Sequence, residues 1–346
     1  MNVLICLKVV KVPQSIVDWY DKFLPNAYLV PIILLILSLG IIGANYVQTG
    51  SVIERDITLK GGLSVTALSP STNPETLEES LLQEFDADIR SRELTDLGRQ
   101  TGVIVEADIS PQQTDIVDEF VDMIASETGI PRGDLSVDTI DSSLGTSFFV
   151  QTMKALWIAF IFMGAAVFFY FGDSKKHKIY IGTAAVVTSI FVFGSSGTLL
   201  ALPALFTVLL LYAYYHYSIP SIAVILAAFS DIIITVAIMD VLGLELGTAS
   251  IAALLMLIGY SVDTDILLST RVLKETSKTL EERVRGALST GIVMTLSTLG
   301  AVAATYSLAQ STTLQQIMLV LIIGLTVDLV NTWFQNTSIL YNYVKD

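Results

Sequence analysis

The sequence has few of the residues from which soluble enzymes build their sites. Only 15% of its 346 residues are charged, and it contains two histidines and one cysteine, Cys6. It has no Gly-x4-Gly-Lys-Ser/Thr loop, His-Glu-x2-His pair or Gly-x-Ser-x-Gly elbow. A single cysteine excludes a disulfide within the chain. These absences leave nucleotide hydrolysis and the common forms of metal or serine catalysis without support, and we expect neither an enzyme nor a cofactor.

What the sequence has in abundance is apolar runs. Hydrophobic residues make up 53% of the chain and the mean hydropathy is +0.67, which is typical of an integral membrane protein. The first run, 27–46, is long enough to cross a bilayer. We predict five segments: 1–46 with the first span, an outer domain 47–147, a second span 148–171, an additional hairpin 172–217, and four further spans in 218–346. The hairpin forms either two true spans or a shallow re-entrant pair.

Negative charge is concentrated in one segment. Residues 47–147 contain 20 of the 33 acidic residues and 6 of the 19 basic ones, so this segment alone has the net charge of −14 found for the whole protein. A surface of this sign repels nucleic acid and anionic lipid headgroups. We therefore expect no nucleic-acid partner.

The same segment alternates between strand and helix patterns. Strands are predicted at 63–68, 89–94, from 102 and at 135–140. Helical patterns lie between them, at 74–85 with Asn73 as the cap and from 116 to 124. The resulting βαββαβ order is typical of a ferredoxin-like α+β domain.

Basic residues indicate how the chain is oriented. Of the 19 lysines and arginines, 12 lie in the N-terminal segment, in 175–178, in 271–285 and at the C-terminus. Another six lie in the acidic domain, and Lys154 lies within a span. Because cytoplasmic loops are enriched in such residues, we expect both termini in the cytoplasm and the acidic domain outside a cell membrane.

Carboxylates inside the apolar runs are the candidate functional groups. They are Asp231, Asp240, Asp263, Asp265 and Asp328. Such groups persist in a span mainly where they face other helices or a wet path, so they are either proton carriers or structural acids. Residues two apart on a helix point about 200° away from each other. We therefore expect Asp263 and Asp265 to differ. In one plausible division, one acid faces Asp231 or Asp328, and the other faces a partner helix or accepts hydrogen bonds from Ser261, Thr264 or Ser269.

The residues around these two acids resemble a known family. The run Gly259-Tyr260-Ser261-Val262-Asp263-Thr264-Asp265-Ile266-Leu267-Leu268-Ser269-Thr270-Arg271 is similar to the fourth-span motif of the SecF family of protein-export membrane proteins, in its archaeal form. Further matches are Ala228-Phe229-Ser230-Asp231-Ile232, Lys60-Gly61-Gly62 and Gly324 to Trp333 around Asp328. The resemblance covers residues from about 27 to 171 and from 218 to 341.

This resemblance implies a fold like that of the RND superfamily, with six core spans and a ferredoxin-like domain after the first. It also implies a SecD homologue as partner, a place in the lipid bilayer beside the SecY translocon, and assistance to exported polypeptide chains driven by the proton gradient. The hypothesis for the mechanism is that protonation of Asp263, coupled to Asp231 and Asp328, changes helix packing. An ion-coupled RND-type transporter of small molecules is the alternative.

Three features depart from the family pattern. The 172–217 hairpin is additional, which brings the predicted number of membrane segments to eight. Met294 stands where bacterial relatives carry an arginine, so an Asp–Arg proton path is not carried over. Thr58 stands in place of an Asp before Gly61-Gly62.

Overall fold

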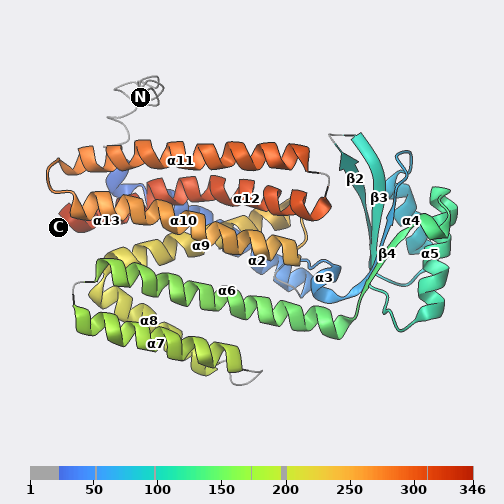
Figure 1. The fold of residues 1–346 in the computed structure, drawn as a ribbon, viewed down its shortest axis with the longest axis horizontal. Coiled ribbons are helices and arrows are strands. Elements are labelled where there is room, and N and C mark those ends of the chain that lie inside the picture. Colours follow the sequence, from blue (N-terminus) through green and yellow to red (C-terminus); the bar gives the residue numbers. More distant parts are fainter. Residues whose placement is uncertain are drawn as a thin grey trace.

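The computed structural model describes residues 23–50, 53–96, 99–172, 174–195, 201–309 and 311–345. A bundle of long helices carries a small sheet domain at one end (Figure 1). Cys6, with the rest of the predicted N-terminal segment up to residue 22, lies outside the described residues. So do residues 196–200 of the predicted hairpin.

Long apolar helices make up the bundle. Within the described ranges, seven helical spans are long and apolar enough to cross a membrane. The helices of the bundle are α2 (Leu29–Thr49), α6 (Ser142–Phe171), α7 (Lys175–Gly194), α8 (Ala201–Tyr217), α9 (Ile219–Val241), α10 (Thr248–Lys274), α11 (Leu280–Leu308), α12 (Thr312–Val330), a π-helix η5 (Asn331–Asn336) and α13 (Thr337–Lys345). Helices α12, η5 and α13 together form one of the seven spans, and α8 is not among the seven. The shorter α8 forms the second arm of the predicted hairpin and packs on α7. Eight complete crossings remain a prediction.

The centre of the bundle is formed by α9, α10 and α12, which pack on one another. An apolar cluster that includes Met239, Leu254, Leu257 and Leu321 fills the space between them towards the sheet domain. Helix α11 covers α10 and α12 and is largely exposed on its other side. The hairpin lies against α6 and α9, away from α11 (Figure 1).

The sheet domain confirms the predicted βαββαβ order. Its elements are β1 (Gly62–Ala67), α4 (Pro74–Glu84), β2 (Ile89–Asp96), β3 (Arg99–Ala107), α5 (Thr114–Thr128), a 3-10 turn η3 (Arg132–Asp134) and β4 (Ser136–Ile140). The strands pair antiparallel in the order β2-β3-β1-β4, which is the ferredoxin-like arrangement. Asn73 caps α4 as predicted, because its side chain accepts a hydrogen bond of 3.0 Å from the Glu75 N–H.

The two faces of this sheet have different environments. Alternate residues such as Leu63, Val65 and Val105 pack against α4 and α5, and together with Phe120 they form the core of the domain. The opposite face, which includes Glu106, looks towards the ends of α10 and α12 across a cleft of about 370 Å³. The domain therefore shows its polar face to the bundle.

A short backbone pairing joins the domain to the bundle. Leu246, in the loop between α9 and α10, donates a backbone hydrogen bond of 2.7 Å to Glu54 and accepts one of 3.2 Å from Asp56. The Asp56 carboxylate caps the four-residue helix α3 (Ile57–Lys60) and accepts a hydrogen bond from the Thr58 hydroxyl. A carboxylate is thus present beside Thr58, two residues earlier than the resemblance led us to expect. A side chain at Gly247 would collide with Asp56, so this close approach requires glycine.

Candidate functional site

Three of the predicted acids meet inside the bundle. Asp231 of α9, Asp265 of α10 and Asp328 of α12 have 1%, 0% and 1% of their surface exposed. They come from the three helices that pack together at the centre. This arrangement brings side chains that are far apart in the sequence into one buried cluster, which we call the carboxyl cluster.

Neutral donors from two helices hold Asp231. The Ser261 hydroxyl of α10 donates to Asp231 Oδ2 over 2.6 Å, and the Asn331 side-chain amide of η5 donates to Oδ1 over 2.7 Å. Both donors are themselves fully buried. Each carboxylate oxygen of Asp231 thus has a partner that carries no charge.

Thr332 lies between the other two acids. Its hydroxyl oxygen is 3.0 Å from Asp265 Oδ1 and 3.1 Å from Asp328 Oδ1, and Asn336 donates to the same Asp265 oxygen over 2.6 Å. A hydroxyl has one hydrogen, so Thr332 can donate to only one of the two carboxyl groups. It makes both hydrogen bonds at once only when the other carboxyl group is protonated and donates to it.

The cluster contains no positive charge. Among the described residues, no lysine or arginine forms an ion pair with any of the three acids. Asp328 Oδ2 is buried and has no hydrogen-bond partner among the described residues. Burying several unpaired negative charges is very costly, so a protonated carboxyl group is the less costly form at such a site. Thr332 links Asp265 to Asp328, and the neighbouring Asn331 of η5 holds Asp231.

The π-helix η5 positions most of the neutral partners. Asn331, Thr332 and Asn336 all belong to its six residues and are fully buried. The wider turn is stabilised by Thr337, whose hydroxyl donates to the Thr332 carbonyl over 2.8 Å. π-Helical turns are rare and frequently occur at functional sites. In the sequence these residues stand out only as a polar run following Asp328.

Asp263, the acid on which the sequence-based hypothesis centred, does not join the cluster. It is exposed on the outer face of α10, whereas Asp265 is directed inward. The expectation that the two acids face different neighbours holds, but Asp265 is the one beside Asp328. The rotation of α10 determines which acid is inside, and the role given to Asp263 in the hypothesis stays a prediction. Asp240 lies apart from the cluster and accepts a hydrogen bond of 2.7 Å from Asn45.

The remaining motif residues divide between the two faces of α10. Ser261 is buried in the cluster, while Gly259 and Tyr260 are exposed, and Arg271 is half-buried near the end of the helix. Met294 is 45% exposed on α11, so it does not line the carboxyl cluster. Thr332 and Asn336, which contact Asp265, were not among the predicted site residues. In the part of the chain that the structure describes, no group of His, Cys, Asp and Glu could hold a metal ion.

Comparison with known proteins places this arrangement in a family. Residues 193–346 match the family model described as protein export membrane protein SecD/SecF, C-terminal. In structure, the chain is similar to SecDF of Thermus thermophilus, described as a translocon-associated membrane protein, with a TM-score of 0.57 and 17% identity. That match covers 94% of this chain but only 38% of the SecDF chain. It supports the predicted RND-like fold class.

Archaeal relatives are similar over nearly their full length. Protein-export membrane protein SecF of Methanolacinia petrolearia is 35% identical over 91% of this chain and 92% of its own. SecF of Methanocaldococcus jannaschii is 32% identical over 92% and 94%, respectively. A shorter match to SecF of Methanothermobacter thermautotrophicus reaches 49% identity over 37% of this chain. Given these matches, the chain belongs to the SecF family of protein-export membrane proteins.

Proposed function

We propose that this protein is the SecF-like subunit of a complex with a SecD homologue, and that it assists exported polypeptide chains at the SecY translocon without enzymatic activity of its own. In this proposal it spans the cell membrane several times, with both termini in the cytoplasm and the acidic domain outside. The proton gradient drives its action through the carboxyl cluster.

The carboxyl cluster is the observation that carries the proposal. Asp231, Asp265 and Asp328 are buried in three neighbouring helices, and neutral groups are their hydrogen-bond donors. When a proton enters or leaves, the hydrogen bonds of Thr332 must rearrange, because its one hydrogen then faces a different carboxyl group. Such a rearrangement changes how η5 packs on α9 and α10. Charged states in a span are costly, so this packing change is strongly coupled to proton binding.

The exposed acid on α10 supports a membrane partner. Ala252, Met256, Gly259 and Asp263 are all exposed and recur at spacings of three or four, so they form one stripe along the helix. A carboxylate facing lipid hydrocarbon is strongly disfavoured. Small residues such as Ala252 and Gly259 allow a second helix to approach closely. We propose that a helix of the SecD homologue covers this stripe.

The test compares three substitutions in cells that depend on this protein. Asp265→Asn and Asp231→Asn keep side-chain size but cannot carry a proton on a carboxyl group. Both should reduce export driven by the proton gradient to the level of cells lacking the protein. Asp240→Asn is the matched control, since Asp240 is an acid of the same bundle outside the cluster, and it should leave export unchanged. Export is followed by pulse-labelling of secreted proteins.

Copurification with the SecD homologue and SecY components separates the possible outcomes. Loss of export with the complex intact supports coupling through the cluster. Normal export in both cluster variants would contradict the assigned mechanism. Normal protein export with loss of gradient-driven uptake of small molecules would favour the transporter alternative.

A further inference from the structure

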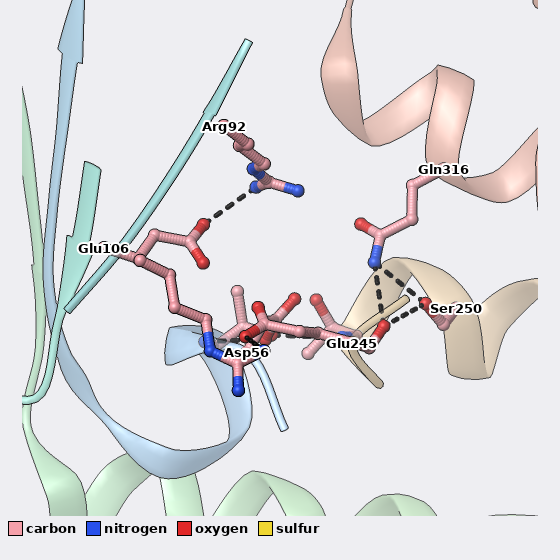
Figure 2. A network of polar contacts seen from close by, with 9 residues as sticks. Asp56, Arg92, Glu106, Glu245, Ser250 and Gln316 are labelled. Carbon is pink, nitrogen blue, oxygen red and sulfur yellow. Dashed lines mark hydrogen bonds and ion pairs between the residues drawn. The ribbon is translucent and has the colours of Figure 1, made fainter. Parts of the chain in front are cut away.

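A second group of titratable side chains lies where the sheet domain meets the bundle (Figure 2). Glu106 of β3 and Glu245 of the α9–α10 loop both lie there, with 11% and 14% of their side chains exposed. They are 139 positions apart in the sequence and belong to different parts of the fold. The junction therefore gathers side chains of the domain and of the bundle.

The backbone of Glu245 is fixed on the bundle side. Gln316 of α12 donates to the Glu245 carbonyl over 3.2 Å and to the Ser250 hydroxyl over 2.9 Å. Ser250 of α10 donates to the same Glu245 carbonyl over 3.2 Å. The side chain of Glu245 thus reaches the domain from a position that two membrane helices define (Figure 2).

Two arginines of the domain face this pair. Arg90 of β2 forms an ion pair with Glu54 and approaches Glu245 to 3.3 Å, while Arg92 contacts Glu106 at 2.8 Å. Asp56 also lies close to Glu106 and Arg92. Four carboxyl groups, Glu54, Asp56, Glu106 and Glu245, are therefore gathered around two guanidinium groups. Positive charge is insufficient to balance all four in their ionised form.

Glu106 and Glu245 are both largely buried, and each of their carboxyl groups lies against an arginine of the domain. Two carboxylates have only acceptors, so they can hydrogen-bond to each other only when one of them carries a proton. We propose that the Glu106–Glu245 pair is a second proton-binding site, outside the membrane helices, and that its bound proton fastens the sheet domain to the bundle. On loss of the proton, the two like charges repel each other and the contact opens.

The direction of the pH dependence follows from the surroundings of the pair. Burial, together with the nearby charge of Glu106, raises the pKa of Glu245 to about 7 against the partial opposition of Arg90 and Arg92. Burial also raises the pKa of Asp56. A raised carboxyl pKa means that the closed junction is most stable in acid and weakens as the pH rises through about 7.

The experiment measures the junction in the purified full-length protein, so it does not depend on the proposed role in export. Spin labels are attached to cysteines introduced at Leu82 on α4 and Leu308 on α11, both exposed, with Cys6 replaced by serine. Double electron–electron resonance then gives the distribution of distances between the two spin labels, one on the domain and one on the bundle, from about pH 5 to about pH 9. At acidic pH we expect a single population of short label-to-label distances. As the pH rises, this population should broaden or shift to longer distances, with a midpoint near pH 7.

Glu245→Gln supplies the decisive comparison, because an amide can donate to Glu106 at every pH. This variant should keep the short population in alkaline buffer, and Glu106→Gln should do the same. Glu79→Gln, at an exposed site on α4, should behave like the parent protein. Infrared difference spectra should show a protonated carboxyl band that titrates in the parent and is lost in Glu245→Gln. Distances that do not change with pH in the parent, or a Glu245→Gln variant that still opens, would overturn the proposal.

Discussion

The two donors to Asp231 have separate roles, because each bonds a different carboxylate oxygen. Removing the Ser261 hydroxyl leaves Oδ2 without its 2.6 Å hydrogen bond in a fully buried site. We expect Ser261→Ala to lower the free energy of unfolding by about 1–3 kcal/mol, the range for an unsatisfied buried polar group. Reversible unfolding in mixed micelles measures the loss. Ser297→Ala, at an exposed position on α11, should have little effect, and an equal loss in both variants would contradict this account.

The acids of α10 show how far the position of a single side chain could be predicted from the sequence. Helical geometry alone places Asp263 and Asp265 on different faces, and the structure agrees. Which face is inside depends on the rotation of α10 against α9 and α12, which the spacing of the two acids alone does not determine. One signal was available, because Ser261, Asp265 and Ser269 recur every four residues and are all buried. That polar stripe could have favoured Asp265 over Asp263.

At the scale of elements, close helix contact depends on particular small residues. A Cβ atom added at Gly291 of α11 would lie 2.2 Å from the Trp333 ring of η5. At Gly300 of the same helix, nothing lies within 4 Å of such an atom. Gly300→Ala should therefore stabilise the helix by up to about 1 kcal/mol. Gly291→Ala should instead destabilise the protein by about 1–3 kcal/mol, because a rigid ring must move.

The same unfolding assay in mixed micelles compares these two glycine variants. A stabilising Gly291→Ala would show that α11 and η5 do not pack as described. If Gly300→Ala were destabilising, the exposed side of α11 would be packed against something else, such as a partner subunit, in the purified protein.

The elements themselves differ in how readily the sequence predicts them. Strand alternation and the Asn73 cap are local signals, so the βαββαβ order and the start of α4 could be predicted. The π-helix could not, because its extra residue per turn is stabilised by the Thr337 hydroxyl and by contacts to acids on other helices. Those contacts exist only once the bundle has formed.

At the scale of the whole molecule, the domain and the bundle meet through residues that are far apart in the chain. Glu54, Glu106 and Glu245 come from three separate segments, and composition reveals only that the domain is acidic. The cleft between the sheet and the bundle is lined by polar side chains, which have weak periodicity in the sequence. The fold class could therefore be predicted, while the junction had to be seen in three dimensions.

The orientation of the whole molecule follows from where its cations lie. The loop between α10 and α11 and its flanks contain Arg271, Lys274, Lys278, Arg283 and Arg285, and the sheet domain lies at the opposite end of the bundle (Figure 1). Because loops rich in lysine and arginine stay in the cytoplasm, the domain should be outside. Single cysteines at Leu82 and at Ser277, both exposed, test this in a Cys6→Ser background. A membrane-impermeant maleimide should label intact cells only at residue 82 and should reach residue 277 after the membrane is opened. The reverse pattern would invert the orientation and would place the Glu106–Glu245 pair in the cytoplasm, where it could not respond to external acid.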